Sequence, residues 1–223
     1  MELKVIAHIH NGFKEKFGIP RQSGITKSLI SRIVFTPEYR CEESLRGLAD
    51  FSHVWVIFQF SESIREDWSP TVRPPRLGGN KRMGVFATRS PFRPNPIGLS
   101  SLKLIGIEKT KNEGTVLLVT GADLLDGTPI YDIKPYLSFT DSHPDAIGGF
   151  ADGVLDKGLR VDFPDELLSI LPENEREDLI RILENDPRPS YQNDENRVYG
   201  MRFSDKEIRF SVKDGILTVC EII

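Results

Sequence analysis

The first 140 residues of this 223-residue chain are a succession of short apolar or alternating runs, and no helical period intervenes. Turn residues such as Lys111-Asn112-Glu113-Gly114 separate the runs. The run from His53 to Phe60 is nearly continuously apolar, which predicts a strand buried on both faces. Strands at this spacing favour a barrel or a sandwich. The predicted strands are Leu3–Ile9, Ile30–Phe35, His53–Phe60, Met83–Thr88, Leu99–Ile107, Gly114–Thr120 and Ile130–Tyr136.

The composition changes near Asp141, where the run DSHPDAIGGFADG is rich in Asp and Gly. This change predicts a β domain over residues 1–140 and a small α+β domain over residues 141–223. Two helices are expected on either side of Pro172, over Asp165–Leu171 and Glu173–Asn185. A three-strand meander follows, with Asp214-Gly215 as a hairpin turn. Its strands are Val198–Phe203, Glu207–Val212 and Ile216–Ile222.

The stretch from Thr71 to Gly98 is basic, with six Lys or Arg residues and no acidic residue. The rest of the chain holds 23 basic and 33 acidic residues, a net charge of −10, so the stretch stands out from an acidic protein. Five prolines and four glycines in it prevent a continuous helix. These charges on shaped loops favour binding of phosphate or another anion over a merely solvated surface. Because the chain as a whole is acidic, a nucleic acid would be held by this local patch and with strong salt dependence.

Several function classes lack support in the sequence. Neither GxGxxG nor a Walker motif occurs, which argues against Rossmann chemistry, and Ser100 lies in no GxSxG elbow. His8 and His10 alternate on one strand without further ligands at metal-binding spacing, so no metal is expected. Cys41 and Cys220 suggest no disulfide framework. The absence of a signal peptide and of a membrane-length apolar run predicts a cytoplasmic protein.

Five segments together resemble the TrmO family, also known as YaeB-like or VirR-like proteins. They are KEKFGIPRQ, LADFSHVWVIFQF, TVRPPRLGGNKRMGVFATRSPFRPNPIGLS, DGTPIYDIKPY and DPRPSY, and they cover the chain from Ile6 to about Tyr191. The resemblance implies a homodimeric, S-adenosylmethionine-dependent tRNA methyltransferase that acts on N6 of threonylcarbamoyladenosine at position 37, in the anticodon stem-loop. It also implies a single-sheeted, non-Rossmann β-barrel methyltransferase domain, mainly β, with the small C-terminal α+β domain beside it.

The resemblance further implies which residues bind the cofactor. They are Pro20, Arg21, Gln22, Ser61, Glu62, Arg89, Leu99, Asp126, Gly127, Thr128 and Pro129. The poorly nucleophilic N6 needs a base or hydrogen-bond acceptor, for which the candidates are Asp126, Asp132 and Tyr131 in that order. Lys134 and Arg89 would hold carboxylate groups of the cofactor or of the substrate. The predicted tRNA contacts are Arg73, Arg76, Lys81, Arg82, Arg93, Lys134 and Tyr136, with Phe92 or Tyr136 stacking on an extruded base.

Two alternatives remain open at this point. A non-catalytic β-barrel module could bind S-adenosylmethionine or another anion-bearing ligand without turnover, since no residue is an unmistakable catalyst. A phosphoester hydrolase could use the basic loops, although paired metal-binding carboxylates and histidines are lacking in the sequence.

Overall fold

The computed structural model describes residues 2–74, 77, 81–154, 158–188 and 194–223. Within these residues, six strands form a closed barrel in the order β1-β2-β7-β6-β3-β8, with all neighbouring pairs antiparallel. The barrel strands are β1 (Ala7–His10), β2 (Ile30–Phe35), β3 (His53–Gln59), β6 (Ile97–Thr110), β7 (Gly114–Thr120) and β8 (Pro129–Pro135). The prediction of a mainly β protein is confirmed, because nearly every predicted strand of the first 140 residues is present.

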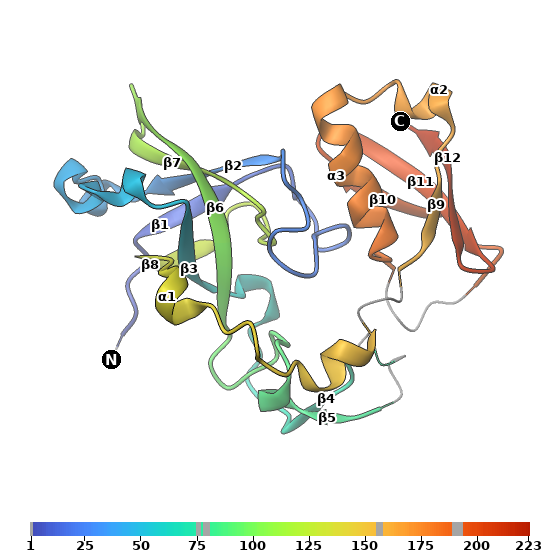
Figure 1. Ribbon diagram of the computed structural model, residues 1–223, viewed down its shortest axis with the longest axis horizontal. Helices are drawn as coiled ribbons and strands as arrows, with labels where there is room; N and C mark the ends of the chain where they lie inside the picture. The colour runs from blue at the N-terminus through green and yellow to red at the C-terminus, as the bar shows by residue number, and fades with distance from the viewer. Residues whose placement is uncertain (1, 75–76, 78–80, 155–157, 189–193) are drawn as a thin grey trace.

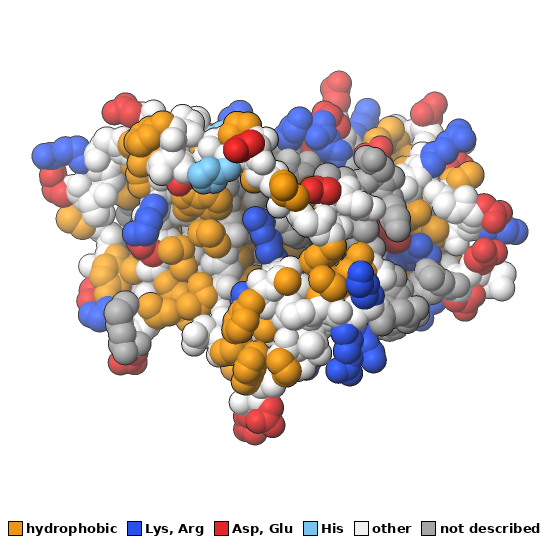
Figure 2. Space-filling model, turned by 60° about the horizontal axis from the view of Figure 1, so that its bottom comes forward, with side chains coloured by type: hydrophobic (Ala, Val, Ile, Leu, Met, Phe, Trp, Pro, Cys, Tyr) orange, Lys and Arg blue, Asp and Glu red, His pale blue; other side chains and the backbone are white. Residues whose placement is uncertain are grey.

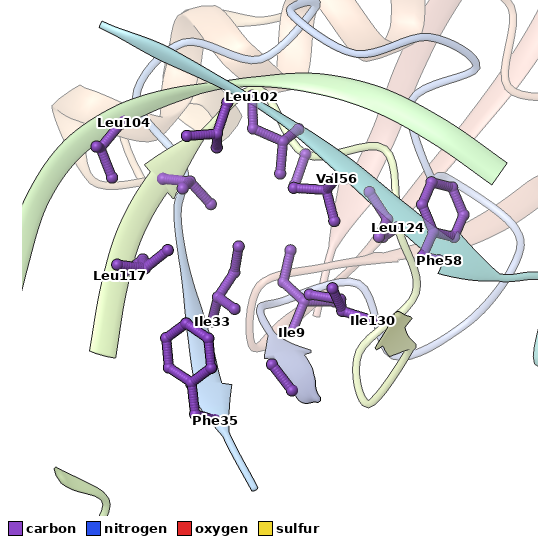
Figure 3. Close-up of a cluster of buried hydrophobic side chains, with 14 residues drawn as sticks. Ile9, Ile33, Phe35, Val56, Phe58, Leu102, Leu104, Leu117, Leu124 and Ile130 are labelled. Carbon is purple, nitrogen blue, oxygen red and sulfur yellow. The ribbon is translucent and has the colours of Figure 1, made fainter. Parts of the chain in front are cut away.

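The barrel interior is filled by aliphatic and aromatic side chains that converge from all six strands (Figure 3). Strand β3 shows the rule, because Val54, Val56 and Phe58 are buried while the residues between them are only half-buried. The prediction that this strand is buried on both faces is therefore wrong. Gly98 of β6 lies directly against the Phe58 ring, since a Cβ there would stand 2.2 Å from the ring. Only glycine fits at this point of the strand.

The basic stretch forms a small separate hairpin below the barrel (Figure 1). Its strands are β4 (Thr71–Val72) and β5 (Met83–Gly84), which pair antiparallel. The predicted strand over Met83–Thr88 ends after two residues, because a 3-10 turn over Val85–Ala87 follows. Further 3-10 turns are Pro37–Tyr39, Glu42–Leu45, Leu48–Asp50, Ser61–Ser63 and Gly149–Val154.

The C-terminal part is a four-stranded sheet, counted over the described residues, with helices beside it (Figure 1). The elements are α1 (Ser138–Asp141), β9 (Arg160–Asp162), α2 (Asp165–Leu168), α3 (Glu173–Glu184), β10 (Tyr199–Phe203), β11 (Lys206–Lys213) and β12 (Ile216–Ile222). The three-strand meander is present as predicted, but β9 adds a fourth strand parallel to β12. The sequence analysis missed β9 because a three-residue strand carries too little periodic signal.

A second hydrophobic core lies between this sheet and α3. It contains Phe13, and Phe17, Ile19 and Leu29 pack against it, although all four come from the N-terminal part of the chain. We call residues 11–29 the connecting segment, because they link β1 to β2 and lie between the barrel and α3 (Figure 1). The second core is thus built from both predicted domains. No helix of the described residues is long and apolar enough to cross a membrane.

Candidate functional site

The connecting segment gathers the residues predicted to bind the cofactor. Pro20, Arg21 and Gln22 lie on it, and its side chains reach three of the other predicted cofactor segments. Lys14 Nζ lies 2.6 Å from Asp126 Oδ2, Lys16 Nζ lies 3.9 Å from Glu62 Oε2, and Arg89 Nη1 donates to Gln22 Oε1 over 2.9 Å. Segments that are about 40 to 100 residues apart in the chain therefore meet at one end of the barrel.

The turn over Asp126–Pro129 precedes β8 and is held by backbone hydrogen bonds to the connecting segment and β1. Gly127 has a φ of +75°, a conformation that favours glycine, and its N–H donates to the Ile9 carbonyl over 2.8 Å. The Asp126 N–H donates to the Phe13 carbonyl over 2.8 Å. The Thr128 hydroxyl is buried and donates to the Leu125 carbonyl. This turn is a rigid support on which a ligand can be bound.

The Asp126 carboxylate is already engaged by its own neighbours. Its Oδ1 accepts a hydrogen bond from the Asn11 N–H over 2.9 Å, and His10 Nδ1 lies 3.5 Å away. Burial raises the pKa of Asp126, but the hydrogen bonds from Lys14 and Asn11 and the charges of Lys14 and His10 together lower it below its ordinary value. A carboxylate with a lowered pKa is a weaker proton acceptor, so the geometry favours Asp126 as a support of the turn over Asp126 as a base.

Asp123 lies three residues before that turn and was not among the predicted site residues. Its Oδ1 is buried and finds no hydrogen-bond partner among the described residues. Burial raises the pKa of the Asp123 carboxyl, and hydrogen bonds from Ser100 and the Ser23 backbone together with the charge of Arg89 lower it by less. The carboxylate is thus close to two predicted cofactor segments, the one at Arg89 and the one next to Gln22. The sequence signal was present, because Asp123 begins the DLLDGTP run.

Arg21 does not present its guanidinium to this site alone. Its Nη2 donates to the backbone carbonyls of Asp186 and Arg188, each over 2.8 Å. Both carbonyls belong to the C-terminal part, directly after α3. Arg21 therefore links the predicted cofactor segment to the second domain, a role that the sequence analysis did not foresee.

Strand β8 carries the other two predicted proton acceptors. Ile130 and Ile133 both face the barrel core although they are three residues apart, because a bulge in the pairing with β3 accommodates Tyr131 as an extra residue. The predicted simple alternation, with Tyr131 and Ile133 on one face, is therefore wrong. Ile57 pairs with both Asp132 and Leu99, so these two residues are two strand spacings apart, about 10 Å. Leu99 is more than half exposed, so a ligand can reach it.

Lys134 and Tyr136 lie toward the far end of β8 from the Asp126–Pro129 turn, by about 20 Å of extended chain. Lys134 Nζ lies 2.7 Å from Asp132 Oδ2. The Tyr136 ring packs against Trp55 and His53, with ring centroids 5.6 and 6.1 Å away. The structure therefore does not bring either residue to the predicted cofactor segments.

The predicted tRNA contacts in the basic stretch divide into exposed and anchored side chains. Arg73, Lys81 and Arg82 are exposed, and Arg82 Nη1 makes one long hydrogen bond, 3.4 Å to Thr71 Oγ1. Arg93 is half-buried instead, because its Nη1 donates to the Val85 and Thr88 carbonyls over 3.1 and 2.7 Å. It supports the loop from inside. Arg76 lies outside the described residues.

Exposed aromatic side chains accompany these charges. Trp68 and Phe86 lie with ring centroids 6.1 Å apart, and the Arg65 guanidinium lies 3.9 Å from the centre of the Phe92 ring. Phe86 is 72% exposed. Figure 2 shows hydrophobic side chains gathered on the face that carries β4 and β5, with Lys and Arg side chains around them. Among the residues that the structure describes, no three His, Cys, Asp or Glu side chains are grouped to hold a metal ion.

Comparisons with known proteins agree on one family. The family model described as tRNA-methyltransferase O N-terminal domain matches residues 8–142, and the TrmO C-terminal domain model matches residues 156–223. The tRNA (adenine(37)-N6)-methyltransferase of Escherichia coli K12 is 40% identical over 222 residues, covering 96% of this chain and 94% of that protein. The protein of the same name from Eikenella corrodens is 51% identical over 171 residues, covering 76% and 95%. The crystal structure of TrmO from P. aeruginosa superposes with a TM-score of 0.78 at 32% identity, covering 100% and 96%.

Proposed function

The chain belongs to the tRNA-methyltransferase O (TrmO) family, and from that premise we propose that it transfers a methyl group from S-adenosylmethionine to N6 of threonylcarbamoyladenosine at position 37 of tRNA. The observation that carries the proposal is the gathering of predicted cofactor residues at one end of the barrel. The connecting segment, Glu62, Arg89 and the Asp126–Pro129 turn meet there through three side-chain contacts. The barrel with this site takes the place of a Rossmann domain.

The residues at this end of the barrel fit the charges of S-adenosylmethionine. That molecule carries a sulfonium, an ammonium and a carboxylate, so it needs both anionic and cationic partners. Asp123 offers a buried carboxylate oxygen without a partner among the described residues, which suits a cationic or hydrogen-bond-donating group. Arg89 is exposed and suits the carboxylate, while Leu99 offers an apolar surface.

When bound, S-adenosylmethionine supplies an electrophilic methyl group that is transferred by in-line displacement. The contribution of the protein is mainly positioning, which can account for roughly 7–11 kcal/mol of the barrier. We propose Asp132 and Tyr131 as the acceptors of the N6 proton, since both lie on β8 across Ile57 from Leu99. Asp126 instead holds Lys14 and the turn in place.

The tRNA is proposed to bind over the basic stretch. Arg73, Lys81 and Arg82 are exposed and can contact phosphates, as can Arg76. Phe92 can stack on a base that leaves the anticodon loop, which is the usual mode of recognition for single-stranded RNA. Lys134 and Tyr136 would contact the tRNA only if it extends along β8, because they lie toward the far end of that strand.

A homodimer is the proposed assembly. Ile64, Trp68, Phe86 and Ile97 are exposed on or next to the basic stretch, and a second copy would remove their apolar surface from water. Sedimentation equilibrium of the purified chain tests this. A species of twice the 25.2 kDa chain mass is expected, and a monomer at micromolar concentration would refute it.

A transfer assay with labelled S-adenosylmethionine tests the enzymatic function. Two tRNAs are compared, one bearing threonylcarbamoyladenosine at position 37 and one with unmodified adenosine there. Label is expected only in the modified tRNA. Label in neither tRNA, together with calorimetric binding of S-adenosylmethionine, would refute catalysis and favour the binding module.

A further inference from the structure

The buried carboxylate of Asp178 on helix α3 contacts the connecting segment at several points. Its Oδ1 accepts the Lys27 N–H over 2.7 Å, and its Oδ2 accepts the Ser28 and Leu29 N–H groups over 2.8 and 2.9 Å. The Ser28 hydroxyl donates to the same Oδ2 over 2.7 Å. Asp178 is 1% exposed. Three consecutive backbone N–H groups are therefore held by one side chain of the other domain.

A second contact between the two domains lies a few residues earlier in the connecting segment. Arg21 donates to the carbonyls of Asp186 and Arg188, at a turn where Asp186 has a left-handed φ of +49°. The Arg188 guanidinium is buried and donates to both carboxylate oxygens of Asp186, over 2.9 and 3.0 Å, which fixes this turn. The two contacts enclose residues 21–29. Between them, the Gly24 N–H donates to the Gly121 carbonyl of the barrel over 2.9 Å.

We propose that Asp178 is a positioning residue for cofactor binding, acting from the C-terminal domain through the connecting segment. This inference rests on the proposed function, because it gives residues 20–22 their role at the cofactor. Asp178 holds residues 27–29, Arg21 is held by the turn after α3, and Gln22 is thereby kept at hydrogen-bond distance from Arg89. The C-terminal domain thus supports the cofactor site without contributing a side chain to it.

The Asp178→Asn substitution tests this role with little change of shape. An amide has a single acceptor oxygen and places its own N–H₂ group against backbone N–H groups, so several of the four hydrogen bonds are lost. Hydrogen exchange of the backbone amides of residues 20–29 should accelerate. The dissociation constant for S-adenosylmethionine, measured by calorimetry at a temperature where the variant is fully folded, should rise about tenfold. The tRNA affinity should stay within twofold.

Two matched controls separate positioning from general loss of stability. Glu177→Gln alters the neighbouring residue of α3, which is exposed and bonds only to Arg181 of the same helix among the described residues. It should change neither exchange nor affinity. Leu183→Ala opens a cavity on α3 within the second core and should lower stability while leaving cofactor affinity within twofold.

Each result decides the proposal. Unchanged exchange of residues 20–29 in Asp178→Asn would overturn it, and so would accelerated exchange with unchanged cofactor affinity. An equal loss of affinity in Leu183→Ala would show that Asp178 acts only through stability. If the unaltered protein binds no S-adenosylmethionine, the proposed function fails and the cofactor role of Asp178 fails with it. The exchange data would still report separately whether Asp178 orders the segment.

Discussion

At the scale of single residues, three aspartates of similar sequence context acquire different properties from their surroundings. Asp126 has a lowered pKa because Lys14 and Asn11 donate to it, whereas Asp123 has a raised pKa because burial outweighs its partners. Asp132 is half-exposed and ion-paired to Lys134. The residue type alone predicted a proton acceptor at Asp126 and Asp132, but only the donors around each carboxylate decide how well it accepts a proton.

Asp123→Asn should make the protein more stable at neutral pH. A raised pKa means that the folded state favours the neutral carboxyl, so the cost of the charge is present above the raised pKa and fades as the pH falls toward the ordinary value near 4. We expect the variant to gain about 1 kcal/mol in the free energy of unfolding at pH 7.5. The gain should shrink as the pH is lowered to 4.5, measured by urea unfolding of both proteins at each pH.

The same variant should bind S-adenosylmethionine more weakly, because the amide loses the charge proposed to face the ligand. Greater stability with weaker binding is the expected signature of a residue kept for function. A variant that is less stable than the original protein at pH 7.5 would contradict this, and would mean that the hydrogen bonds from Ser100 and Ser23 outweigh burial.

At the scale of elements, the basic stretch shows where residue counting succeeds and where it fails. Its prolines and glycines correctly predicted loops in place of a helix, and the described part forms only a two-residue hairpin and a 3-10 turn. Its six charges were treated alike in the sequence, yet Arg93 donates into the loop while Arg73 and Arg82 are exposed. The hydrogen bonds of a guanidinium to carbonyls are a tertiary property that charge counting does not reveal.

Arg82→Ala and Arg73→Ala should each weaken tRNA binding a few-fold and reduce the slope of log affinity against log salt by about 1, as expected for one lost phosphate contact. Filter binding of tRNA at several salt concentrations measures both quantities. Lys111→Ala, an exposed lysine in the turn after β6, is the control and should change neither. A salt slope that stays the same in both arginine variants would remove this surface from the tRNA interface.

At the scale of the whole molecule, two hydrophobic cores share one connecting segment. Phe13 is buried in the second core although it belongs to the N-terminal part of the chain, and its carbonyl accepts the Asp126 N–H of the barrel turn. The predicted boundary near residue 141 remains a prediction about where the chain passes from one unit to the other. The packing nevertheless couples the stability of the C-terminal core to a segment on the other side of that boundary.

Phe13→Ala should lower the free energy of unfolding by about 3–5 kcal/mol, the usual cost of removing a fully buried phenylalanine ring. Urea unfolding followed by circular dichroism provides the measurement. Phe139→Ala removes a ring that is 85% exposed and should cost less than 0.5 kcal/mol. If Phe13→Ala cost no more than this control, the connecting segment would not be part of the second core in solution.

The sequence by itself determined the strands, the main helix and the loop character of the basic stretch. Strands Ile30–Phe35 and Gly114–Thr120 match their predicted bounds, because alternation and turn residues act over a few neighbouring positions. The long arginine-proline motif and the DGTP run were enough to identify the family, which the comparisons confirm. These are local signals, and they are written in contiguous residues.

Only the tertiary structure decided which residues meet. The bulge at Tyr131, the parallel pairing of β9, the unpartnered oxygen of Asp123 and the contact of Asp178 with residues 27–29 all join positions that are distant in the chain or depend on a neighbouring strand. A buried polar group takes its properties from the donors and charges that surround it, and folding brings those neighbours from other segments. The periodicity of one segment contains no information about them.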